Sequence, residues 1–166
     1  MNYSFGFFMC ANLRINYLMN KNLLNRLLFI TGIISIGAAL WHLLCIWGGI
    51  SWFIFARAPN VVIQSVQQGT LLAPTSTMIV ASLMIICGLY AFSCAQRIRK
   101  LPLLKSAAFT IALLCLMRVV LVLPTLWQNN FNDLWQVVAT SVWLFVGMSF
   151  VLYLINRYIK KYKQKA

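Results

Sequence analysis

Acidic side chains are almost absent from this chain. Its 166 residues include one aspartate or glutamate and one histidine, against fourteen lysines and arginines. A pair of carboxylates for general acid–base catalysis is therefore excluded. Three or four ligands for a metal ion cannot be assembled from one such chain either. We expect no metal, no cofactor and no enzymatic activity.

The cysteines also lack the pattern of a reactive or metal-binding site. None of the five forms a C-x-x-C pair, and most lie in apolar runs: Cys10, Cys45, Cys87, Cys94 and Cys115. A free cysteine in such a run behaves as a small hydrophobic side chain. A disulfide framework or a thiol-exchange centre is not expected. The chain also has no phosphate-binding loop, no hydrolase elbow and no visible repeat.

Charge of either sign is scarce, and this decides the class of protein. Only 9% of residues are charged and 62% are hydrophobic, whereas a soluble domain carries about a quarter charged residues. Four apolar segments of about the ~20 residues that cross a bilayer follow one another: Leu27 to Trp47, Pro74 to Ala95, Ser106 to Leu123 and Leu134 to Ile155. Because none alternates like a barrel strand, we predict an all-α fold, a bundle of four transmembrane helices. Pro124 is expected to stop the third.

The basic residues predict the orientation of this bundle. Twelve of the fourteen fall on one side of the membrane: Arg14, Lys21, Arg26, Arg97, Arg99, Lys100, Lys105, Arg157, Lys160, Lys161, Lys163 and Lys165. The positive-inside rule then places both termini in the cytoplasm of a bacterium, with the protein in the inner membrane. Arg57, Arg118 and Asp133 belong to the outer half. Topology accounts for the net charge of +13, so nucleic acid is not an expected partner; membrane lipids are, at about 1 kcal/mol per basic residue.

The chain divides into three parts around the membrane domain. Residues 1–26 form a cytoplasmic tail, residues 27–156 the four-helix domain and residues 157–166 a basic cytoplasmic tail. Residues 1–18 show an apolar patch without a helical stripe, and Met19 opens a short basic lead into the first span. We interpret residues 1–18 as an over-extended gene start or a loose tail, so Met1 and Met19 are alternative starts.

The first outer connection, from Gly48 to Ala73, is long enough to hold structure of its own. Gly48 and Gly49 are expected to end the first helix, and Pro59 begins a turn. The pattern of residues 61–68 predicts a short helix at the membrane interface. Its polar face is formed by Gln64, Gln67 and Gln68. Asp133 stands at the N-cap position of the fourth helix.

Polar residues of the outer half suggest a binding site. Gly32, Ser35, Ala39 and His42 follow helical spacing and form a stripe typical of helix contact, which directs His42 into the bundle. A guanidinium at Arg118 costs at least ~2.5 kcal/mol at the bilayer centre and needs a carboxylate, carbonyls, a phosphate or water. The candidate binding residues are His42, Arg118, Asp133, Gln64, Gln67, Gln68 and Arg57.

Each of these residues also has a purely structural interpretation. Arg118 can extend to the outer headgroups, His42 can bond a neighbouring helix, and Asp133 can serve as a cap only. The outer tryptophans are better explained as interface anchors than as ligand stackers: Trp47, Trp52, Trp127 and Trp135.

The order of several motifs resembles a family of small four-span bacterial membrane proteins of unknown function. These motifs are Trp47-Gly48-Gly49 after His42, Pro59, APTSTMIVASL at 73–83, CLMRVV at 115–120 and FND at 131–133. The nearest named group is the AciT-type ciprofloxacin tolerance proteins. The resemblance covers about residues 27–155 and implies a link to envelope integrity and drug tolerance. It marks six positions for testing: His42, Gly48, Gly49, Thr77, Arg118 and Asp133.

Three classes of function fit these features. We predict a small inner-membrane protein that supports envelope integrity or drug tolerance by binding a protein partner, another copy of itself or a lipid headgroup at the outer polar site. An oligomeric drug transporter is the alternative, although no acidic residue lies inside a span for proton exchange. A lipid-modifying enzyme is the weakest interpretation, because only His42 offers a general base.

Overall fold

The computed structural model describes residues 21–128 and 133–163, and within these ranges every regular element is a helix. Four helices are long: α2 (Lys21–Gly48), α5 (Leu72–Cys94), α6 (Leu104–Gln128) and α7 (Leu134–Lys163). All four are long and apolar enough to cross a membrane. The predicted fold class is confirmed. The interpretation of residues 1–18 concerns a part of the chain outside the described residues.

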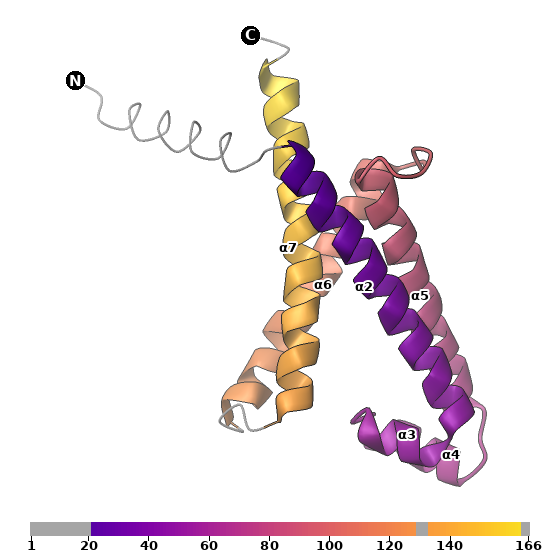
Figure 1. Ribbon diagram of the computed structural model, residues 1–166. Coiled ribbons are helices and arrows are strands. Elements are labelled where there is room, and N and C mark those ends of the chain that lie inside the picture. The colour runs from indigo at the N-terminus through magenta and orange to yellow at the C-terminus, as the bar shows by residue number, and fades with distance from the viewer. Residues whose placement is uncertain (1–20, 129–132, 164–166) are drawn as a thin grey trace.

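The long helices form two antiparallel pairs. The pair α2–α5 has the most extensive contact, followed by the pair α6–α7, while α2 also touches α7. Figure 1 shows the two pairs meeting near the beginning of α2 and separating toward α3 and α4. We call the end where α2 begins and α7 ends the basic end. The opposite end, which carries Trp41, Trp52, Trp127 and Trp135, is the tryptophan end.

Small residues allow α2 and α5 to approach closely. A Cβ atom added to Gly88 of α5 would lie 3.2 Å from the carbonyl oxygen of Gly32 on α2. Further along, the Ser35 hydroxyl lies 3.7 Å from the Cys87 sulfur, and Ala39 packs against Ala81. Such contacts are the usual means of helix association in lipid. The predicted contact stripe on the first span is therefore confirmed for its buried members.

The main core lies where all four long helices meet, in the half nearer the basic end. Leu28 of α2, Ala91 of α5, Ala108 of α6 and Phe150 of α7 belong to one cluster, and all four have an exposed fraction of 0%. The two helix pairs are thus joined by side-chain packing at this level.

The prediction that Pro124 stops the third span is wrong, because α6 continues to Gln128 with Pro124 inside it. A proline removes one hydrogen bond, here the bond to the carbonyl of Val120, and strains the preceding turn. The loss falls in the last part of the helix, and Leu126 beyond it is only 4% exposed. The chain therefore remains helical beyond Pro124 with one backbone bond fewer.

The connection between α2 and α5 holds two short helices, α3 (Ile50–Phe55) and α4 (Asn60–Gln67). Gly49 has a φ of 70°, which ends α2 as the Gly-Gly pair predicts. The helix α4 matches the short helix predicted for residues 61–68, and its place at a membrane interface stays a prediction. The helix α3 was not predicted.

The helix α4 is held in place by one buried hydroxyl. Ser65 accepts a hydrogen bond of 2.9 Å from the backbone N–H of Ala73, and its oxygen lies 2.6 Å from the Thr70 hydroxyl. Since Ala73 stands at the beginning of α5, this fixes α4 to the second span.

Candidate functional site

His42 lies in the second-last turn of α2 and is half-buried. Its Nδ1 is 2.7 Å from the carbonyl oxygen of Ala38, four residues earlier in the same helix. A carbonyl can only accept, so Nδ1 carries the proton and Nε2 of the neutral ring is left as an acceptor. The structural interpretation of a bond to a neighbouring helix is wrong, since the partner lies within α2. Among the described residues, the other ring nitrogen, Nε2, has no hydrogen-bond partner.

Arg118 lies on the open face of α6. It is exposed, and within the described ranges it makes no hydrogen bond or ion pair. Its neighbours on the helix surface are apolar and also exposed: Leu114 at 60%, Met117 at 50% and Leu121 at 71%. The guanidinium is thus a single cation in a surface otherwise suited to acyl chains.

The depth of Arg118 follows from the full length of α6. Beyond Arg118 the helix continues for ten residues to Gln128, about 15 Å at 1.5 Å per residue. Tryptophan is enriched at the headgroup level, and we predict this level at Trp127, which is 74% exposed. An extended arginine side chain is shorter than the distance between the two levels. Arg118 therefore lies further from this predicted headgroup level than it would if α6 ended at Pro124.

Asp133 joins the second helix pair to the first connection. Its carboxylate accepts a bond of 3.4 Å from the backbone N–H of Gln136, so it caps α7 as predicted. The same carboxylate lies 4.0 Å from the guanidinium of Arg57, which follows α3. Next to it, the Trp135 indole N–H donates to the carbonyl of Ala56 at 3.0 Å. Residues about 80 positions apart in the chain are brought together here.

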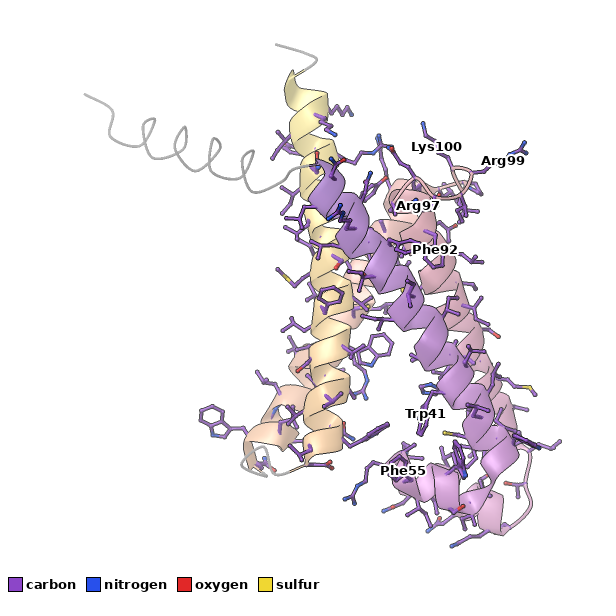
Figure 2. All side chains as sticks on the ribbon, viewed as in Figure 1. Trp41, Phe55, Phe92, Arg97, Arg99 and Lys100 are labelled. Carbon is purple, nitrogen blue, oxygen red and sulfur yellow. The ribbon has the colours of Figure 1, made fainter. Side chains whose placement is uncertain are left out.

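Four aromatic rings complete this junction, which we call the aromatic junction: Trp41 of α2, Trp52 and Phe55 of α3, and Trp135 of α7. The ring centroids of neighbouring pairs are 5.5–6.0 Å apart. Figure 2 shows Trp41 and Phe55 in the space between the two helix pairs. Trp52 and Trp135 pack on other rings of the junction, and their predicted role as interface anchors stays a prediction.

One polar atom of the aromatic junction has no hydrogen-bond partner in the described chain. The indole nitrogen of Trp41 is buried and has no hydrogen-bond partner among the described residues. A buried donor without an acceptor costs about 1–3 kcal/mol.

The predicted site is brought together only in part. Arg57 and Asp133 meet, and His42 follows Trp41 in the last turns of α2. No hydrogen bond or ion pair joins Arg118 to His42 or Asp133 within the described chain. The amide face of α4 is exposed, as expected, through Gln64, Gln67 and Gln68. The pattern that could have revealed the aromatic junction is the i, i+3 spacing of Trp52 and Phe55.

The basic end has an ordered loop between α5 and α6. The Ser93 hydroxyl donates to the carbonyl of Arg99 at 3.1 Å and accepts from the N–H of Leu101 at 3.0 Å. The Arg97 guanidinium lies 5.0 Å from the centre of the Phe29 ring, a cation–π contact between this loop and α2. In Figure 2 the side chains of Arg99 and Lys100 extend away from the helices.

Metal-binding groups do not gather in the described ranges. No three histidine, cysteine or acidic side chains are close enough to share an ion there. The four cysteines of these ranges are free: Cys45, Cys87, Cys94 and Cys115.

Comparison of the chain with family models, curated proteins and solved structures finds no match. The resemblance to AciT-type proteins therefore stays a prediction. What the structure gives directly is a four-span membrane protein with an exposed arginine on one helix and a polar and aromatic junction at one end.

Proposed function

We propose that this protein is an accessory protein of a bacterial inner membrane, which acts by binding an anionic group at Arg118. The supporting observation is the position of Arg118, exposed among apolar side chains and without a partner in the described chain. A guanidinium facing acyl chains costs about 2.5–3.5 kcal/mol near the bilayer centre. A bound anion removes this cost and adds a charge-assisted, bidentate contact.

The anion has to come from another molecule. The chain has one acidic residue, Asp133, and that carboxylate already lies beside Arg57 and caps α7. Asp133 of a second copy would also be at the wrong depth in a parallel assembly, since it begins α7 at the tryptophan end. The headgroup layer is level with Trp127, about 14 Å from Arg118 along α6. We therefore favour a carboxylate on a partner's transmembrane helix over a lipid phosphate.

The role of such a complex is part of the same proposal. The resemblance to ciprofloxacin tolerance proteins supports a contribution to envelope integrity, with drug tolerance as its consequence. The proposal includes no catalytic step and no transported substrate. His42 and the aromatic junction would shape the tryptophan end of the complex.

The proposal is tested by purifying the protein from its own membranes in a mild detergent. We compare the unmodified chain with Arg118→Leu, Arg118→Lys and the control Arg57→Leu, which removes the other outer cation. One protein should co-purify in stoichiometric amount with the unmodified chain and with the control. Breaking a buried ion pair costs about 3–5 kcal/mol, so Arg118→Leu should reduce its recovery at least tenfold, with less loss for Arg118→Lys.

Growth under ciprofloxacin and membrane stress is measured on the same strains. Sensitivity should rise only where the partner is lost. Full recovery of the partner and full tolerance with Arg118→Leu would remove the proposal. Recovery of a stoichiometric phospholipid in place of a protein would show that the anion is a headgroup.

A further inference from the structure

A groove of about 610 Å³ runs between α6 and α7, next to the basic end. Its walls are apolar and include Phe109 and Leu113 of α6 and Leu154 of α7. Three exposed cations stand around it: Lys105 from the first turn of α6, and Arg157 and Lys161 from the end of α7. None of the lining residues is acidic. The groove is separate from Arg118 and from the aromatic junction.

The length of the groove matches one leaflet of a bilayer. Lys105 and Leu116 are both lining residues and lie eleven positions apart on α6, about 17 Å along the axis. Half of a ~30 Å hydrocarbon core is about 15 Å. A partner's transmembrane helix would need a groove along the whole thickness, whereas an acyl chain needs one half.

The charge at the groove favours an anion strongly. Two helices supply the three cations, and one of them, Arg157, also lies 5.8 Å from the centre of the Tyr153 ring. The only acidic side chain of the sequence is Asp133, at the other end of α7. No acidic side chain among the described residues therefore neutralises these cations. Basic pockets between transmembrane helices are suited to lipid phosphates.

We propose that this groove is a binding site for an anionic phospholipid of the leaflet at the basic end. Lys105, Arg157 and Lys161 hold the negatively charged phosphate of its headgroup. One acyl chain lies along Phe109, Leu113 and Leu154. A zwitterionic lipid gains less, because its cationic headgroup faces the same three cations.

Native mass spectrometry of the full chain tests the charge requirement, with equimolar phosphatidylglycerol and phosphatidylcholine in the micelle. The unmodified protein should retain phosphatidylglycerol at least fivefold more than phosphatidylcholine, with one lipid held most tightly. The triple variant Lys105→Gln, Arg157→Gln, Lys161→Gln should lose this preference. The matched control Arg99→Gln, Lys100→Gln, Lys160→Gln removes three exposed cations at the same end but outside the groove, and should keep it.

A second pair of variants tests the apolar part of the site. Leu113→Trp places a larger side chain in the groove at a position already 47% exposed, so folding should be little affected, and the tightly held lipid should be lost. Leu114→Trp, the next residue and not a lining residue, should leave it in place. Equal losses in both triple variants, or retention of the lipid by Leu113→Trp, would overturn the proposal. So would an unmodified protein that shows no anionic preference.

Discussion

Single side chains join the two helix pairs at the tryptophan end. Asp133 caps α7 and faces Arg57, and Trp135 donates to the carbonyl of Ala56. The cap depends only on neighbours in the chain, so the sequence was sufficient to predict it. The contacts to Arg57 and Ala56 depend on where α3 lies, and no local pattern in the sequence contains that information.

Substitution of Asp133 separates its two roles. Asp133→Asn keeps the cap and removes the ion pair; since Arg57 is 66% exposed, this should cost no more than about 1 kcal/mol. Asp133→Ala removes both and should cost about 1 kcal/mol more, the usual value of an N-cap. The measurement is the free energy of unfolding by denaturant in micelles. Equal destabilisation by the two variants would show that the ion pair, not the cap, is the main contribution.

Loss of the Trp135 hydrogen bond should loosen the same junction. Trp135→Phe keeps an aromatic ring but leaves the Ala56 carbonyl without its donor, at about 0.5–1.5 kcal/mol. Amide hydrogen exchange in α3 should accelerate. Trp47→Phe, at a side chain that is 90% exposed, is the control and should change nothing there. Unchanged exchange in Trp135→Phe would mean that ring packing alone holds α3.

The helices α2 and α5 pack against each other through small residues. The stripe on α2 could be predicted because glycine, serine and alanine recur at helical spacing on an apolar helix. The end of α6 could not, because local rules make proline a stop signal, whereas α6 continues past Pro124 to Gln128. The helix α3 was missed for a related reason. The six residues of α3, of which Ser51 is polar, are too few to establish a helical period, and α3 is held by rings from α2 and α7.

Two glycines of α2 provide a matched test of helix contact. A Cβ atom on Gly32 would lie 2.5 Å from the Phe92 ring of α5, while one on Gly37 would meet nothing within 4 Å. Gly32→Ile should therefore destabilise the protein by about 1–3 kcal/mol through overpacking. Gly37→Ile should be nearly neutral. Thermal unfolding in detergent distinguishes them, and an equal effect of both would contradict the close contact of α2 with α5.

The molecule as a whole has two chemically different ends. The beginning of α2 and the end of α7 lie together at the basic end (Figure 1), and the aromatic junction lies at the other. Composition was sufficient to predict the four spans, since length and hydropathy decide them. The candidate site was harder to predict. The position of a residue along its own helix does not determine which other helices lie beside it. The helix α6 packs mainly on α7, and Arg118 is on the exposed face of α6.

The predicted orientation is testable by thiol labelling in intact cells. The five cysteines are replaced by alanine, and one cysteine is introduced as Gln67→Cys in α4 or Ile98→Cys in the basic loop, both at exposed positions. The positive-inside rule predicts that a membrane-impermeant maleimide labels only Gln67→Cys until the cells are permeabilised. The reverse pattern would place the basic end outside.

Photo-crosslinking beside Arg118 tests the binding proposal in the native membrane. A photoreactive residue replaces Leu121, one turn from Arg118 and 71% exposed, or Ile79 on α5 as a control at 62%. The account predicts one discrete protein adduct from position 121, absent from position 79, kept with Arg118→Lys and lost with Arg118→Leu. An adduct that forms equally with Arg118→Leu, or no protein adduct at position 121, would contradict it.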